Sequence, residues 1–140
     1  MKKIYLLLIL IIVLFIAGCG LSNQGTGNVV KEIPPANTIE FTNGGLNPSD
    51  LIINQGDKIT WLNKDDSGTE YWPASAMHPT HTVYPGSDIK KCGTSEEKNI
   101  FDLCRGLKQG ESFSFTFNEK GIWGYHDHLN PKLHGKITVN

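Results

Sequence analysis

Residues 121–139 form the stretch that most limits how this chain can fold. Trp123 and Tyr125 alternate with small or polar residues, which is the pattern of a half-buried β-strand. An Asn-Pro pair then signals a turn, and apolar and polar residues alternate again over residues 135–139. The stretch therefore predicts two β-strands joined by a turn that carries several side-chain nitrogen atoms.

His126 and His128 lie two positions apart in the first of these strands. Side chains at positions i and i+2 of a strand project from one face, about 7 Å apart. The two imidazoles are therefore expected to face the same way, close enough to bind one metal ion. Asp127 lies between them and is expected on the opposite face, with Trp123 and Tyr125.

Short alternating segments also fill the earlier part of the chain. Residues 38–42, 51–53 and 58–63 have the pattern of strands, and turns rich in Gly, Asn and Asp separate them. Residues 111–117 place three phenylalanines on one face and Ser and Thr on the other, which predicts a core strand. Short strands with such turns predict an all-β sandwich or barrel.

Two longer segments interrupt the strands. Residues 65–77 are expected to form a loop without a strand, because Pro73 and the Ser and Gly content oppose strand pairing. Residues 88–110 form an insertion that holds Cys92 and Cys104. Outside the cytoplasm two such cysteines usually pair, so we expect a disulfide, with metal binding by the two thiols as the alternative.

The C-terminal stretch resembles the signature of the cupredoxins, small blue-copper β-barrels, which runs Tyr-x-Cys-x-x-His-Pro-x-Met-x-Gly-x-Ile-x-Val. Asp127, Asn130 and Leu133 stand where that signature has the copper cysteine, the second histidine and the axial methionine. The resemblance implies a single Greek-key sandwich of about seven to eight strands over residues 38–140. The three replacements imply that the blue type 1 copper site is absent. The residues that carry the resemblance are Tyr125, Asn130, Pro131, Leu133, Gly135, Ile137 and Val139.

Two further resemblances concern the histidines. His81 and Val83 match the setting of the first cupredoxin copper histidine, which stands at the start of a strand. Residues 121–128 are similar to the Gly-Thr-x-Trp-Tyr-His-x-His motif of multicopper oxidases, and residues 77–81 are similar to the start of their His-Pro-x-His-x-His motif. These resemblances imply a thiolate-free histidine site for copper, or alternatively for zinc. The expected ligands are His78, His81, His126 and His128.

The neighbours of these histidines have expected roles of their own. Asp127 and Asn130 are expected to orient the bound rings through the ring nitrogens that do not bind metal. His134 is expected to be an unligated surface residue, because its position in the signature is usually variable and basic. The alternative for the two histidine pairs is that all four rings remain unligated.

The N-terminus has the features of a targeting segment. Lys2 and Lys3 precede an apolar run over residues 4–17, which is shorter than a bilayer span and typical of a signal-peptide core. The run leads into Ile-Ala-Gly-Cys, which resembles the lipobox of bacterial lipoproteins. Residues 1–18 are therefore expected to be a lipoprotein signal peptide with lipid on Cys19; the alternative is an uncleaved membrane anchor.

Residues 19–37 are expected to form a flexible linker, because Gly, Ser, Asn, Gln and Thr dominate them and cannot build a core. Removal of the signal peptide removes Lys2 and Lys3, so the 13 basic residues fall to 11 against 14 acidic residues, a net charge of −3. This charge provides no basic surface for nucleic acid.

The sequence thus predicts a protein outside the cytoplasm that is anchored by lipid to the cell membrane or the outer membrane. The first hypothesis for its function is copper capture, buffering or delivery. The alternatives are a mononuclear copper oxidoreductase and a degenerate cupredoxin that serves as an interaction module. The oxidoreductase has less support, because one domain with five histidines has too few for a trinuclear cluster beside a type 1 site.

Overall fold

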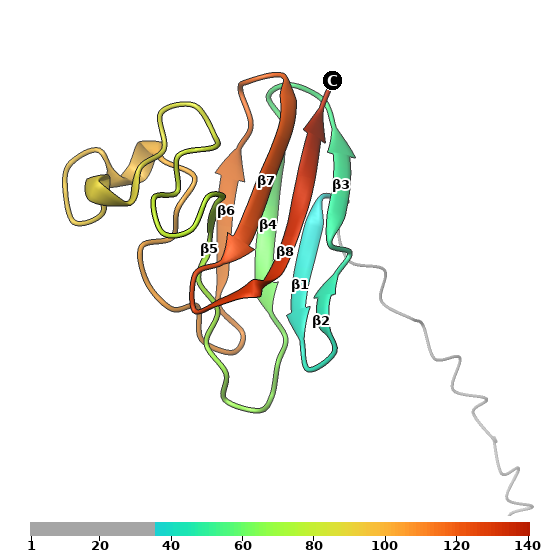
Figure 1. The fold of residues 1–140 in the computed structure, drawn as a ribbon. Coiled ribbons are helices and arrows are strands. Elements are labelled where there is room, and N and C mark those ends of the chain that lie inside the picture. The colour runs from blue at the N-terminus through green and yellow to red at the C-terminus, as the bar shows by residue number, and fades with distance from the viewer. Residues whose placement is uncertain (1–35) are drawn as a thin grey trace, which may run out of the picture. The chain divides into compact units, whose positions relative to one another are not determined.

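The computed structural model describes residues 36–140 of the chain, which fold into two four-stranded sheets packed against each other (Figure 1). The predicted signal peptide, Cys19 and residues 19–35 of the predicted linker lie outside the described residues. The first sheet has the strand order β2-β1-β4-β6 and the second has the order β3-β8-β7-β5. The strands are β1 (Thr38–Thr42), β2 (Gly45–Asn47), β3 (Asp50–Ile53), β4 (Lys58–Asn63), β5 (Pro73–Ser75), β6 (Ser112–Thr116), β7 (Gly121–Asp127) and β8 (Asn130–Val139).

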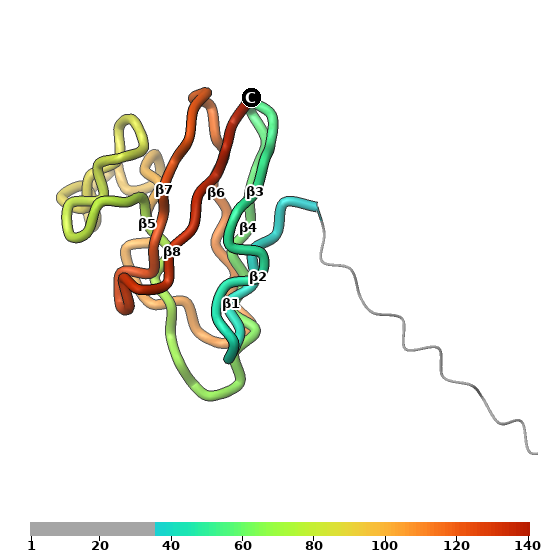
Figure 2. The backbone as a smooth tube through the Cα atoms, turned by 45° about the vertical axis from the view of Figure 1, so that its right-hand side comes forward, coloured from blue at the N-terminus to red at the C-terminus, as the bar shows by residue number. Residues whose placement is uncertain are grey.

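Two parallel strand pairs join segments that are far apart in the sequence. β1 pairs in parallel with β4, and β3 pairs in parallel with β8, while the other pairs are antiparallel. In the ribbon and in the tube view, the end of β8 lies beside β3 (Figures 1 and 2). Gly135 permits this close approach, since a Cβ atom there would lie 2.0 Å from the carbonyl oxygen of Ser49. The Tyr125 hydroxyl donates a hydrogen bond to the same oxygen at 2.7 Å.

The core between the sheets is aromatic, as the alternation of residues 111–117 predicts. Trp61 is fully buried, and four other rings have their centroids 4.9 to 6.3 Å from its own. These rings come from β6 and its end, from β7 and from the insertion of residues 88–110. The aromatic contacts therefore connect both sheets with the insertion. The four rings belong to Phe101, Phe113, Phe117 and Tyr125. The all-β sandwich predicted from the sequence is confirmed.

Two strand boundaries differ from the sequence prediction. Residues 65–77 were expected to contain no strand, but β5 lies within them and pairs with β7. The prediction was wrong because β5 is a three-residue edge strand that begins with Pro73, a position where the missing N–H is tolerated. The last strand was expected to resume at residue 135, but β8 begins at Asn130 and the turn is correspondingly shorter.

The insertion of residues 88–110 projects at the side of the sandwich away from β1 and β2 (Figures 1 and 2). It contains two short 3₁₀-helices, η1 (Ile89–Lys91) and η2 (Glu97–Asn99). Cys92 and Cys104 form the predicted disulfide across it. No helix among residues 36–140 is long and apolar enough to cross a membrane.

Candidate metal centre

The structure brings together the four histidines that the sequence selects. His78 and His81 lie in the loop that follows β5, His126 lies in β7, and His128 follows that strand directly. Each ring contributes one nitrogen atom, and these four atoms all lie within 4.8 Å of one another. Four imidazole nitrogens at such mutual distances can bind a single ion.

The cluster is closed on the protein side and open on one side to solvent. His81 is 0% exposed and His126 is 4% exposed, whereas His128 is half-buried and His78 is exposed. The His78 ring centroid lies 5.4 Å from that of His126 and 4.8 Å from that of His128. His78 therefore borders the cluster from the solvent side, across from the two buried rings.

His81 is held at both ring nitrogens. Its Nδ1 lies 2.5 Å from Oδ2 of Asp102, and its Nε2 lies 2.9 Å from Nδ1 of His128. His81 was expected at the start of a strand, but it lies outside any strand and has a φ of 58°, in the left-handed region that few side chains adopt. An unusual backbone conformation at a buried polar residue is a mark of a functional site.

Asp102 is fully enclosed beneath the cluster. Its Oδ1 accepts hydrogen bonds from Nε1 of Trp72 at 2.5 Å and from the backbone N–H of Cys104 at 2.8 Å. Burial acts to raise the pKa of Asp102, but the hydrogen bonds from His81, Trp72 and Cys104 hold this pKa below its ordinary value. The carboxylate is therefore ionised at neutral pH and accepts from all three donors.

His126 differs from its neighbours because neither ring nitrogen has a hydrogen-bond partner, although both are buried. Burial lowers the pKa of His126 to about 4, and the nearby rings of His81, His78 and His128 lower it as well. The imidazole is therefore neutral at physiological pH. A neutral, buried and unpartnered ring nitrogen has its lone pair available to a metal ion.

His128 is held by Trp72. The two ring centroids lie 4.3 Å apart, and the backbone N–H of His128 donates a hydrogen bond to the backbone carbonyl oxygen of Trp72 at 2.8 Å. Burial lowers the pKa of His128, and the rings of His81 and His78 lower it further. Like His126, this ring therefore favours the neutral form that binds metal.

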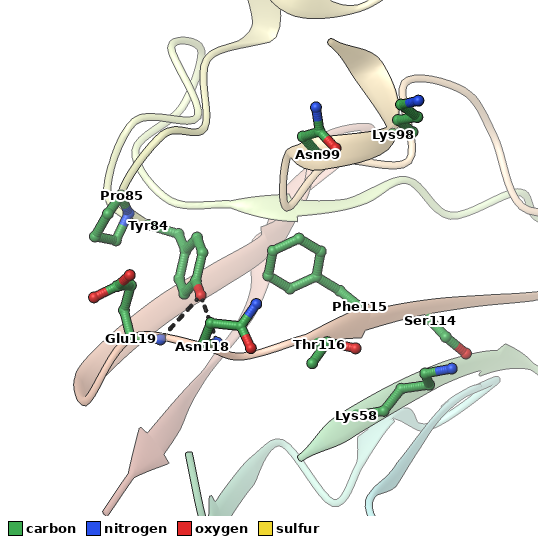
Figure 3. Close-up of a pocket in the computed structure, with 10 residues that line it drawn as sticks. All are labelled: Lys58, Tyr84, Pro85, Lys98, Asn99, Ser114, Phe115, Thr116, Asn118 and Glu119. Carbon is green, nitrogen blue, oxygen red and sulfur yellow. Dashed lines mark hydrogen bonds between the residues drawn. The ribbon is translucent and has the colours of Figure 1, made fainter. Parts of the chain in front are cut away.

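A separate hollow lies over β4, β6 and the insertion, and no histidine is among the described residues that line it (Figure 3). Lys58, Lys98 and Glu119 border it together with the Tyr84 ring. The Tyr84 hydroxyl accepts hydrogen bonds from the N–H groups of Asn118 and Glu119, at 2.9 and 3.3 Å. These hydrogen bonds connect the β6–β7 turn with the loop that carries Tyr84. The hollow is separate from the histidine cluster.

The chain is similar to known proteins in its sequence and in its fold. No family model matches the chain. Plastocyanin of Silene latifolia subsp. alba is 35% identical over 103 residues, which are 71% of this chain but only 56% of that relative. A purple cupredoxin from Nitrosopumilus maritimus superimposes with a TM-score of 0.55 at 22% identity, over 74% of this chain and 98% of its own. The domain has a cupredoxin-like fold.

Two further structures share the fold. A variant of amicyanin in its reduced Cu(I) form aligns with a TM-score of 0.53 at 18% identity, over 77% of this chain and 85% of its own. A copper-containing nitrite reductase from Thermus scotoductus aligns with a TM-score of 0.55 at 18% identity, over 74% of this chain and 22% of its own. At these identities the structures establish the fold of the domain and not its activity.

Within this cupredoxin-like domain the histidine cluster and the replaced signature positions border different hollows. Asp127, Asn130 and Leu133 line one hollow with Tyr71, whereas His78 and His126 line another. Asp127, at the position of the signature cysteine, is not among the four residues whose ligand atoms lie within 4.8 Å of one another.

The residues expected to orient the rings are placed differently from the expectation. Oδ1 of Asp127 accepts hydrogen bonds from the backbone N–H groups of Trp72 and Leu129, at 2.7 and 3.1 Å. Burial raises the pKa of Asp127. Asn130 is exposed at the start of β8. The carboxylate that contacts a histidine ring is that of Asp102, which the sequence analysis missed. Its one signal in the sequence is an acidic residue between two apolar ones, Phe-Asp-Leu, in the insertion.

His134 and the cysteines stand outside the cluster. His134 pairs with His126 across the β7–β8 ladder, but it is exposed and does not belong to the described group of four close nitrogens. Cys92 and Cys104 lie near Asp102, but their sulfur atoms are bonded to each other and cannot act as thiolate ligands. The predicted disulfide is therefore confirmed, and the alternative that the two thiols bind metal is wrong.

Proposed function

We propose that this chain is a lipid-anchored protein outside the cytoplasm that binds copper through four histidines and serves copper capture, buffering or delivery. The proposal rests on one observation: His78, His81, His126 and His128 each present a ring nitrogen within 4.8 Å of the other three. It goes beyond the fold, which many proteins with different activities share.

The residues present fit a metal ion. The two nitrogens of His126 are buried without a partner, and an unsatisfied buried polar group costs about 1–3 kcal/mol. An ion in the cluster would satisfy one of these nitrogens directly. The lowered pKa values of His126 and His128 keep both rings neutral, which is the form that binds metal. The folded protein thus holds His126 neutral and without a hydrogen-bond partner before the metal ion binds.

Copper suits this donor set better than other ions. Imidazole binds Cu, Zn, Ni and Fe, and Cu(II) binds most tightly among the divalent ions. Copper is also named for the amicyanin and nitrite reductase structures that share the fold. When bound, copper would supply a redox-active cation without a thiolate ligand, since Asp127 stands at the cysteine position. The loss of that ligand favours storage or delivery of the ion and argues against blue-copper electron transfer.

The N-terminal sequence and the disulfide support the proposed location. A signal peptide over residues 1–18 with lipid on Cys19 would place the domain outside the cytoplasm, tethered by the linker of residues 19–37. The Cys92–Cys104 disulfide is consistent with an oxidising compartment. Substitution Cys19→Ala is expected to stop lipidation and to release the protein or leave an uncleaved precursor. Unchanged membrane attachment without either form would instead indicate a simple anchor.

The metal content of the full-length protein, purified from membranes with mild detergent and without chelators, tests the proposal. We expect about one copper per chain in the wild type and in His134→Ala, and a large loss of copper in His126→Ala. Zinc at one per chain would replace copper as the physiological ion. Absence of bound metal in all three proteins, together with failure to take up either ion, would refute the proposal and favour an interaction module.

A further inference from the structure

We propose that Asp102 is the positioning residue of the metal centre, which fixes the tautomer of His81 so that this ring binds metal through Nε2. The inference rests on the proposed function, because it concerns how one of the four ligands is prepared. It assigns a role to the insertion, which the resemblance to copper proteins leaves unexplained. The observations that carry it are the hydrogen bonds of the Asp102 carboxylate and the direction of each.

The carboxylate of Asp102 cannot rotate freely, because each oxygen has its own donors. Oδ1 accepts from Trp72 Nε1 at 2.5 Å and from the Cys104 N–H at 2.8 Å, and neither of these groups can act as an acceptor. Oδ2 therefore faces His81 Nδ1, 2.5 Å away. The side chain of Asp102 is 0% exposed, so water does not compete for these bonds.

This arrangement decides which nitrogen of His81 carries the proton. An ionised carboxylate only accepts, so His81 must donate its Nδ1–H to Oδ2. Nε2 then keeps its lone pair, and it points at the cluster, 2.9 Å from Nδ1 of His128. The negative charge of Asp102 also lies directly behind the ring that would receive a cation, which strengthens the ring as a ligand.

Asp102 reaches a second ligand through Trp72. The indole that donates to Oδ1 also packs on the ring of His128, with the centroids 4.3 Å apart. The other donor to Oδ1 is the N–H of Cys104, which the disulfide ties to Cys92. One buried carboxylate thus connects two of the four histidines to the disulfide-bonded insertion.

The substitution Asp102→Asn gives a directional test. The amide oxygen must take the place of Oδ1, because both groups there are donors, and the amide NH₂ must then face Nδ1 of His81. Nδ1 becomes an acceptor, the proton moves to Nε2, and the lone pair needed for metal is lost. We expect copper affinity to fall by roughly 10- to 100-fold. In the metal-free protein, two-bond ¹H–¹⁵N spectra should show His81 change from the Nδ1–H to the Nε2–H tautomer.

Asp127→Asn is the matched control. Asp127 is a second buried carboxylate, but the groups that donate to its Oδ1 are the backbone N–H groups of Trp72 and Leu129. Its conversion to an amide is expected to leave the His81 tautomer unchanged and copper affinity within a few-fold of wild type. Near-UV circular dichroism of both variants reports whether the aromatic core stays packed.

Three results would overturn the proposal. The first is an Nε2–H tautomer of His81 in the metal-free wild type, which needs no variant to fold. The second is a tautomer change in Asp102→Asn that leaves copper affinity at the wild-type level. The third is an equal loss of affinity in Asp127→Asn. A wild-type protein that binds neither copper nor zinc would instead refute the proposed function, while the tautomer spectra would still decide the contact between Asp102 and His81.

Discussion

The metal-free protein is expected to lose stability on acidification because His126 is buried as a neutral ring. The pKa of His126 is about 4 in the folded protein, against 6.5 for an ordinary histidine. Between these values the unfolded chain binds a proton that the folded chain does not, so folding becomes less favourable as the pH falls. The free energy of unfolding is therefore unaffected by His126 above a pH of about 6.5, and it decreases as the pH falls from there toward 4.

The size of the effect follows from the shift. Lowering the pKa of His126 from 6.5 to about 4, at 1.36 kcal/mol per pKa unit, corresponds to a loss of about 3 kcal/mol in the free energy of unfolding. The lowered pKa of His128 adds a loss of the same sign, whereas the raised pKa of Asp127 acts in the opposite direction over the acidic part of this range. Besides burial, the charges of the neighbouring His81 and His78 contribute to the lowered pKa of His126, and the charge of Asp102 opposes them.

Urea unfolding of chelator-treated protein at a series of pH values from 7 to 4.5 measures this loss. We expect the free energy of unfolding of the wild type to fall by about 1 kcal/mol per pH unit below pH 6.5. The variant His126→Asn, which cannot titrate, should show a clearly shallower dependence. A wild-type stability that is flat over this range, or equal slopes in the two proteins, would refute the argument that His126 is buried and neutral.

Three further predictions concern the fold and the colour of the site. Gly135→Ala is expected to destabilise the domain by about 1–3 kcal/mol in urea unfolding, because its Cβ would collide with the Ser49 carbonyl; a neutral effect would contradict the β3–β8 contact. Replacement of both Cys92 and Cys104 by serine should cost about 3 kcal/mol of stability and should also weaken copper binding, whereas an unchanged affinity would mean that the disulfide does not support Asp102. Copper-loaded protein should lack the intense visible band of a copper–thiolate centre, and a strong blue or purple colour would contradict the histidine-only site.

Much of the fold could be predicted because its signals are local. Alternation with a period of two identified the strands from residues 38–42, 58–63 and 111–117, and the three phenylalanines of the last segment do pack in or against the core. The spacing of His126 and His128 likewise placed their rings near each other without knowledge of the tertiary structure. The strand patterns depend only on local geometry. His128 lies just beyond the end of β7, so the spacing predicted that its ring lies near that of His126 but not its place in the strand.

The missed features depend on contacts between distant segments. Asp102 is 21 residues from His81, and they meet because the insertion is tied by a disulfide and packed by Phe101 into the core. Alternation also fails locally, since the β7–β8 register shifts between His126 and Asp127. The expected role of Asp127 assumed a carboxylate that could reach a ring nitrogen, whereas its hydrogen bonds are to backbone N–H groups.

The second difficulty concerns short edge strands. β5 has three residues and begins with proline, so its own sequence contains too little periodicity to reveal it. It nevertheless positions the site, because it pairs with β7 opposite His126 and leads into the loop of His78 and His81. Its existence depends on the unpaired edge of β7, which is a property of the sheet and not of the segment.

Copper titration of His81→Ala, His126→Ala and the double variant, against a competing chelator, tests the central claim most directly. If the histidines hold one ion, each single substitution should weaken binding steeply, while His134→Ala should not. The double variant should then lose much less than the sum of the two single losses, because the site is already incomplete after the first. Single variants that bind like the wild type, or losses that simply add, would show separate weak sites and contradict a shared metal centre.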